Sequence, residues 1–240
     1  MRFTCLRGLP AQKLGATALL MATLALGSLA AAHGIAGKDA DFVAQNSGVQ
    51  IFPFLYFGAK HMVTGYDHLL FLLGVIFFLY RLQHVALYVT LFSLGHSITL
   101  LSGVLGHIHV NPYLVDAIIG LSVVYKALDN LGGLKALFGR QPDARLAVLG
   151  FGLVHGFGLA SKLLDLKPSA DGLVGNMISF NVCVELGQLV ALGVMLGLMG
   201  WWRTTGSFTR NAVLANALIM IAGLVLVEYQ LAGYFLQRYA

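Results

Sequence analysis

The stretch that decides the fold is LVGNMISFNVCVELGQLVALGVMLGLMGW, residues 173–201. Its only charged side chain is Glu185. The stretch is longer than the roughly 20 apolar residues with which an α-helix crosses the hydrocarbon core of a bilayer. It therefore predicts a transmembrane helix.

The composition of the whole chain agrees with this interpretation. Of its 240 residues, 58% are hydrophobic and 10% are charged, and the mean hydropathy is +0.80. A soluble domain carries roughly a quarter charged residues, which its water-exposed surface requires. The composition therefore predicts an integral membrane protein and excludes a cytosolic enzyme or a nucleic-acid-binding protein.

Apolar runs separated by short polar breaks extend this prediction to the rest of the chain. The first run is overlong, and Gly65 gives it a natural place to bend. The expected fold is all-α, a polytopic membrane helix bundle of about six transmembrane helices within residues 51–240. The six runs are residues 51–80, 85–105, 112–128, 146–164, 173–201 and 213–231.

The N-terminal residues have the pattern of a secretory signal peptide. Three cations, Arg2, Arg7 and Lys13, precede an apolar stretch that ends in small residues at Ala32. We expect residues 1–32 to be cleaved off; the alternative is an uncleaved additional span. Cleavage leaves 12 Lys and Arg against 10 Asp and Glu, a net charge of +2 (12 − 10), with no basic patch for nucleic acid.

A cleaved signal peptide also predicts the orientation. The new N-terminus, with residues 33–50 as a leader, lies in the periplasm, and the protein belongs to the inner (cytoplasmic) membrane of a bacterium. The distribution of Lys and Arg over the predicted loops has the same sign, although the bias is weak.

Several ionisable residues fall inside the predicted spans. An Asp at membrane depth costs about 2.5 kcal/mol or more, so such residues mark a site or an ion path. Imidazole and carboxylate ligands suit nickel, zinc, cobalt or copper, whereas Mg²⁺ and Ca²⁺ require more oxygen ligands. The alternative is a set of hydrogen bonds between helices. The predicted metal ligands are His61, Asp67, His68, His96, His155 and Glu185.

The spacing in the first span constrains how its residues act. His61 and His68 are seven residues apart, so they share one helix face but lie two turns, about 10 Å, apart. They can share one metal ion only if the helix bends near Gly65; otherwise they are successive stations on one path. Asp67 points about 120° away from them in a straight helix. In that direction its carboxylate can accept a hydrogen bond from a histidine of another helix and so orient that ring.

Other polar residues are peripheral to these spans. His107 and His109 lie in a predicted outer loop, and His33 is the first residue after the predicted cleavage, so all three are candidates for metal capture. Lys126 and Asp129 have the spacing of a local ion pair at the membrane edge. No role is assigned to Asp116.

The spans also carry a resemblance to the HupE/UreJ family, small bacterial membrane proteins associated with hydrogenase and urease systems and regarded as secondary nickel or cobalt permeases. The resemblance covers about residues 51–190. It rests on four segments: His61-x5-Asp67-His68-Leu-Leu-Phe-Leu-Leu, Phe92-Ser-Leu-Gly-His96-Ser-Ile-Thr-Leu, Gly152-Leu-Val-His155-Gly-Phe-Gly and Phe180-Asn-Val-Cys-Val-Glu185-Leu-Gly-Gln.

The resemblance implies that His61, Asp67 and His68, together with His155 and Glu185, form a metal path. His96 matches the branch of the family that is most similar to this chain. One departure is at Asp129, where a Glu before the following Asn is expected.

The expected function is a permease for a divalent transition metal, with nickel as the first candidate and cobalt, copper or zinc as others. Its partners are the metal ion and the lipid bilayer, with a homo-oligomer as a further candidate, and no prosthetic group or enzyme activity is expected. The alternatives are a membrane metalloenzyme that uses the same cluster and a structural or assembly subunit of a metalloenzyme system.

Overall fold

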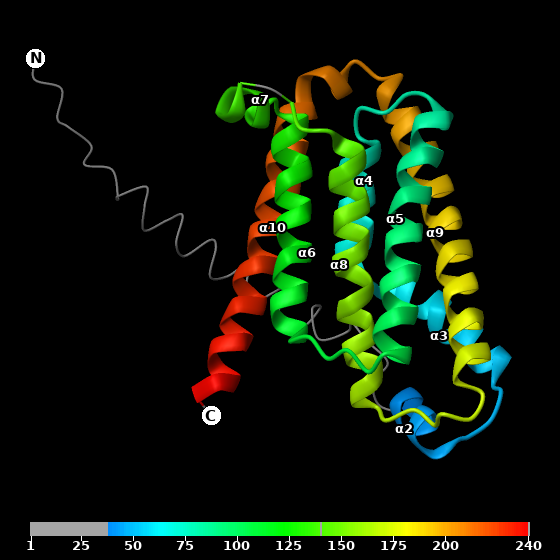
Figure 1. Cartoon of the computed structure of the whole chain (residues 1–240). Helices are drawn as coiled ribbons and strands as arrows, with labels where there is room; N and C mark the ends of the chain where they lie inside the picture. Colours follow the sequence, from blue (N-terminus) through cyan, green and yellow to red (C-terminus); the bar gives the residue numbers. More distant parts are fainter. Residues whose placement is uncertain (1–37, 140, 240) are drawn as a thin grey trace, which may run out of the picture.

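The computed structural model describes residues 38–139 and 141–239, which contain helices and no strand (Figure 1). The predicted all-α class is confirmed for these residues, while the predicted signal peptide and His33 lie outside them. The helices are α2 (Lys38–Gln45), α3 (Ile51–Thr64), α4 (Tyr66–Ile76), α5 (Leu82–Leu105), α6 (Pro112–Asn130), α7 (Gly133–Phe138), α8 (Ala144–Asp165), α9 (Leu173–Arg203) and α10 (Ser207–Tyr239).

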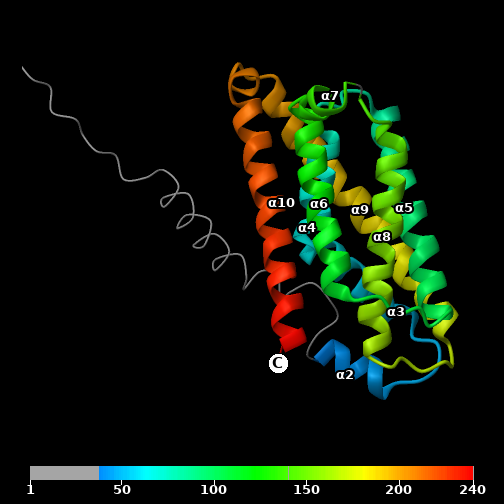
Figure 2. The same cartoon turned by 60° about the vertical axis from the view of Figure 1, so that its left-hand side comes forward.

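The long helices lie side by side in one bundle, with short connections at its two ends (Figures 1 and 2). Helix α5 packs mainly against α8, α6 against α10, and α3 against α9. The short helix α4 lies in the interior, where it contacts α5, α6, α9 and α10. We call the two ends of the bundle the α2 end and the α7 end after the small helices that lie there (Figure 2).

Glycines allow α5 and α8 to approach closely. A Cβ atom at Gly152 would overlap the backbone of Phe92, and one at Gly156 would overlap the carbonyl oxygen of His96. Two small residues four positions apart are a common pattern at close contacts between membrane helices, and Gly152 and Gly156 form such a contact here. The similar spacing of Gly193 and Gly197 has no such role within the described chain, because nothing lies within 4 Å of either position.

The predicted bend of the first span is confirmed as a complete break. Gly65, with φ −78° and ψ 84°, separates α3 from α4. Helix α4 then ends at Ile76, short of the predicted end at residue 80. The Arg203 guanidinium group donates hydrogen bonds to the carbonyl oxygens of Ile76 (2.5 Å) and Phe77 (2.8 Å), so a residue of α9 satisfies the end of α4.

The polar segment before the first span is attached to the α2 end. The backbone N–H of Gln50 donates to Oδ1 of Asn176 at 2.6 Å, and Nδ2 of Asn176 donates to the carbonyl oxygen of Gly48 at 3.0 Å. Val43 of α2 is buried in the core. Residues 38–50 are therefore an ordered part of the fold.

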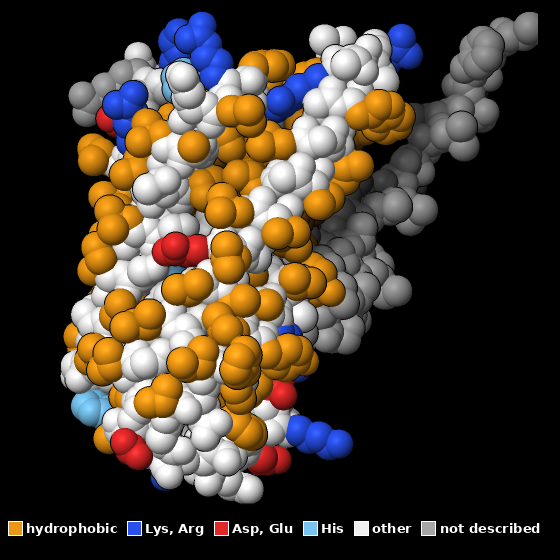
Figure 3. Space-filling view, turned by 90° about the vertical axis from the view of Figure 1, so that its right-hand side faces the viewer, with side chains coloured by type: hydrophobic (Ala, Val, Ile, Leu, Met, Phe, Trp, Pro, Cys, Tyr) orange, Lys and Arg blue, Asp and Glu red, His pale blue; other side chains and the backbone are white. Residues whose placement is uncertain are grey.

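The surface has the character of a multi-pass membrane protein. Helices α5, α8, α9 and α10 are long and apolar enough to cross a membrane. Hydrophobic side chains cover the middle of the face shown in Figure 3, while Lys and Arg side chains gather at its ends. Two predicted spans differ from these four, because α3 and α4 are separate short helices and α6 carries Asp116, Lys126 and Asp129.

Candidate metal centre

The break at Gly65 brings two histidines of the first span together. His61 lies in the last turn of α3 and His68 in the first turn of α4. Their ring centroids are 4.8 Å apart, about half of the 10 Å rise that separates them in a straight helix. Of the two predicted arrangements, the structure has the one in which both rings are close enough to share an ion.

Gly65 is required for this arrangement for a second reason. A Cβ atom at this position would overlap Nδ1 of His68 and would lie 3.0 Å from the carbonyl oxygen of His61. The absence of a side chain thus leaves room for the His68 ring beside the break.

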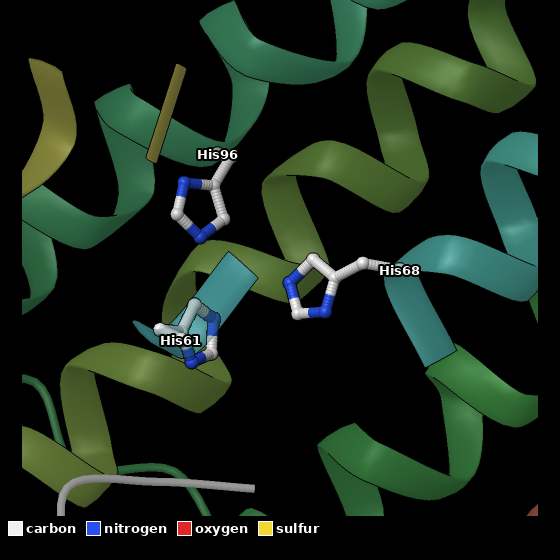
Figure 4. A group of neighbouring side chains, drawn as sticks. All are labelled: His61, His68 and His96. Carbon is white, nitrogen blue, oxygen red and sulfur yellow. The ribbon is translucent and has the colours of Figure 1, made fainter. Parts of the chain in front are cut away.

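A third histidine reaches the same place from α5. Ring nitrogens of His61, His68 and His96 lie within 4.8 Å of one another, and Figure 4 shows the three rings directed toward a common space. Metal–nitrogen distances are about 2.0–2.1 Å, so two ligands on one ion lie up to about 4.2 Å apart. Three ligands around one ion lie about 3.5 Å apart, so ring movements of up to about 1 Å would close this group around an ion.

A second group overlaps the first. Asp67, His68 and His155 offer ligand atoms that lie within 4.8 Å of one another, and all three residues are buried. The rings of His68 and His155 are 3.8 Å apart between centroids. Nε2 of His155 lies 4.0 Å from Oδ2 of Asp67. Because His68 belongs to both groups, the four histidines and Asp67 form one continuous cluster, which we call the histidine cluster.

Asp67 orients its own neighbour. Its Oδ1 lies 2.8 Å from Nδ1 of His68 and accepts the backbone N–H of His68 at 2.9 Å. An ionised carboxylate only accepts hydrogen bonds, so Nδ1 of His68 donates and Nε2 keeps its lone pair for a ligand. Asp67 thus orients a histidine of its own helix, and its predicted role toward a histidine of another helix stays a prediction, with Nε2 of His155 in α8 at 4.0 Å from Oδ2.

Four ring nitrogens in the histidine cluster have no hydrogen-bond partner in the described structure. Nε2 is buried and unpaired in His61, His68, His96 and His155. Buried polar atoms are nearly always paired, and each unpaired one costs about 1–3 kcal/mol. Four such atoms in one place are poorly explained by hydrogen bonds between helices and well explained by a ligand that accepts nitrogen lone pairs.

Glu185 lies apart from this cluster. It is the only acidic residue of α9, it is exposed, and its Oε1 accepts a hydrogen bond from Ser97 at 3.4 Å. Figure 3 shows an acidic side chain in the middle of a hydrophobic face. The structure does not bring Glu185 into either group of candidate ligands, and its place in a metal path stays a prediction.

The two loop histidines lie at the α2 end, and both are exposed. Nε2 of His109 lies 3.1 Å from Oδ1 of Asp165, at the end of α8. At the other end of the bundle, the predicted ion pair between Lys126 and Asp129 is confirmed, with Nζ 2.6 Å from Oδ2. Asp129 therefore lies at the α7 end and away from the histidine cluster.

A layer of phenylalanines lies next to the histidine cluster and was missed by the sequence analysis. Phe71, Phe92 and Phe151 each stand one helical turn from a cluster histidine, in α4, α5 and α8. Because α4 runs opposite to α5 and α8, all three lie on the α7 side of the histidines (Figure 1). The Phe71 ring centroid is 5.4 Å from that of Phe92 and 5.9 Å from that of Phe151. The signal in the sequence is an aromatic residue three or four positions from each histidine.

Comparison with known proteins agrees with the geometry. The sequence model of a family described as HupE / UreJ protein matches residues 37–238. No curated protein and no solved structure gave a significant match.

Proposed function

Because this chain belongs to the HupE/UreJ family, we propose that it is a secondary permease for a divalent transition-metal ion, with nickel as the first candidate. The observation that carries the proposal is the set of four buried, unpaired Nε2 atoms in the histidine cluster. Neutral imidazole is a good ligand for nickel, cobalt, copper and zinc.

The arrangement fits transport better than permanent storage of an ion. The nitrogen atoms lie within reach of one ion but are not closed around it. Conduction requires binding that is favourable enough to admit an ion and weak enough to release it. Asp67 adds one negative charge that offsets part of the charge of the ion.

The proposed topology places this cluster in the bacterial inner membrane. We propose six crossings, of which α3 and α4 together form the first, and a periplasmic N-terminus that is produced by cleavage of the signal peptide. The α2 end then faces the periplasm and the α7 end faces the cytoplasm.

Uptake of radiolabelled nickel by cells tests the proposal. His68→Ala removes the histidine that both ligand groups share, so we expect uptake to fall to the level of cells without the protein. His84→Ala is the matched control, because His84 is exposed in α5 and belongs to neither group. Equal uptake by the wild type and His68→Ala, at equal amounts in the membrane, would refute the permease. Elemental analysis of purified protein for nickel, cobalt, copper and zinc identifies the metal.

A further inference from the structure

A partly buried ion pair lies between the histidine cluster and the α2 end. Nζ of Lys162 lies 2.6 Å from Oδ2 of Asp116, and their side chains are only 25% and 12% exposed. Asp116 is in the first turns of α6, and Lys162 is in the last turn of α8. Gly158 allows α6 to approach α8 at this point, because a Cβ atom at this glycine would lie 2.7 Å from Cγ1 of Val115. Asp116 follows Val115 in α6 and therefore lies close to α8.

The ion pair separates two spaces. Toward the α2 end lies a cleft of about 730 Å³, here called the vestibule, which is lined by polar and apolar groups of α6, α8, α10 and the loop before α6. Toward the histidine cluster lies a cavity of about 10 Å³, roughly the room of one water molecule. Asp116 and Lys162 line both spaces, whereas Asp67, His68 and His155 line only the inner cavity.

The register of α8 gives the order of these groups along the bundle. His155, Leu159 and Lys162 are four and then three residues apart, so they lie on one helix face. Lys162 stands about 10 Å from His155 along the axis, because seven residues rise 1.5 Å each. A cation that moves from the vestibule to the histidine cluster therefore meets Asp116 and Lys162 first.

We propose that Asp116 is an outer ligand of the transported divalent cation, and that Lys162 neutralises this carboxylate until the cation displaces it. This inference rests on the proposed permease function and names a site outside the histidine cluster. A lysine ammonium group is a single charge on a flexible stem, so it can leave the carboxylate by rotation of its side chain. A divalent ion interacts with the same carboxylate more strongly, because its charge is twice as large.

The displaced ammonium group has a second partner nearby. Asp165 lies three residues after Lys162 on α8, at a spacing that allows an ion pair along a helix. Asp165 is exposed at the vestibule wall, where it contacts His109. The exchange thus leaves neither Asp116 nor Lys162 as an unpaired charge inside the bundle.

The test measures how readily Lys162 reacts with a water-soluble N-hydroxysuccinimide ester. Purified full-length protein is acylated with and without Ni²⁺ or Zn²⁺, and each lysine is quantified by mass spectrometry of its peptides. We expect metal to raise the acylation rate of Lys162 about tenfold, which corresponds to pairing that is weaker by about 1.4 kcal/mol. The reason is that an ion pair with the exposed Asp165 holds the ammonium group less strongly than the pair with Asp116. Lys167 is the internal control, because it is exposed at the same end and outside the vestibule.

Two variants separate the possible causes of such a change. In Asp116→Asn, Lys162 should react fast without metal and show no response to it. In His68→Ala, the response should persist, because the outer site does not need the histidine cluster. An unchanged Lys162 in the wild type, or a response that His68→Ala abolishes, would overturn the outer site. Failure of the proposed permease function has a different readout: nickel uptake would be the same in the wild type and in His68→Ala.

Discussion

Asp67 acts on the centre through its hydrogen bond to Nδ1 of His68. A carboxylate in this position fixes the tautomer of the ring and increases the basicity of the other nitrogen. We expect Asp67→Asn to weaken nickel binding about 10- to 100-fold, measured by isothermal titration calorimetry on purified protein. Asp41→Asn is the control, because Asp41 is an exposed acid of α2. Equal affinity of the wild type and Asp67→Asn would show that the Asp67 carboxylate does not tune the His68 ring and serves only to accept the backbone N–H in the first turn of α4.

The residues of the histidine cluster were predicted from a simple signal, an ionisable side chain inside an apolar run. The same signal selected Glu185, which the structure places on an exposed face of α9. Hydropathy records that a residue lies at membrane depth but does not record which side of a helix it faces. The direction of each face depends on packing between helices that are far apart in the sequence, such as the glycine contacts of α5 with α8.

At the scale of an element, the break between α3 and α4 creates the ligand geometry. A side chain at Gly65 would overlap the His68 ring, so Gly65→Ala must move the ring or rotate the two helices. We expect this substitution to abolish high-affinity nickel binding while the protein still inserts into the membrane, as checked by calorimetry and by the amount in membranes.

Gly193→Ala provides the matched control for this substitution. It adds the same methyl group to a helix, at a position with nothing within 4 Å. The expected affinity of Gly193→Ala equals that of the wild type. Retention of full affinity in Gly65→Ala would show that the break does not determine the ligand geometry.

The phenylalanine layer is a second feature of the helices that is expected to control the path of the ion. Hydrophobic constrictions close ion pathways to hydrated ions, and Phe71, Phe92 and Phe151 lie on the α7 side of the histidine cluster. We expect Phe151→Ala to let nickel leak into proteoliposomes without saturation, measured with an enclosed metal-sensitive dye. Phe235→Ala is the control, because Phe235 is an exposed residue of α10. Saturable influx in both variants would exclude a closing role for the layer.

Element boundaries were predictable where hydropathy changes and unpredictable where a distant residue sets them. The predicted span 85–105 has the same end as α5, and the next predicted span begins where α6 begins, at Pro112. The end of α4 was predicted too late, because Arg203, 127 residues away from Ile76, satisfies its carbonyl groups. The small helix α7 was not predicted, because its six residues are too few to form an apolar run of the length of a span.

At the scale of the whole molecule, the two ends of the bundle are unequal. The α2 end has the vestibule, which leads through Asp116 and Lys162 toward the histidine cluster. The α7 end of the cluster is covered by the phenylalanine layer. The described conformation therefore has its open space on the α2 side of the buried metal ligands, the side from which uptake would start if the α2 end faces the periplasm.

The charges of the two ends also predict which one faces the cytoplasm. Lys and Arg are more numerous at the α7 end than at the α2 end, and cytoplasmic ends carry the excess of Lys and Arg. Among the described residues, the cations at the α7 end are Arg81, Lys126, Lys135, Arg145, Arg203 and Arg210, and those at the α2 end are Lys38, Lys60, Lys162 and Lys167.

Labelling of single cysteines tests this orientation. Ala170→Cys lies in the loop between α8 and α9 at the α2 end, and Gly206→Cys lies between α9 and α10 at the α7 end; both positions are exposed. In a Cys183→Ser background, a membrane-impermeant maleimide should label Ala170→Cys in cells with a permeabilised outer membrane. Gly206→Cys should react only after lysis. The opposite pattern would turn the vestibule toward the cytoplasm and refute the proposed orientation.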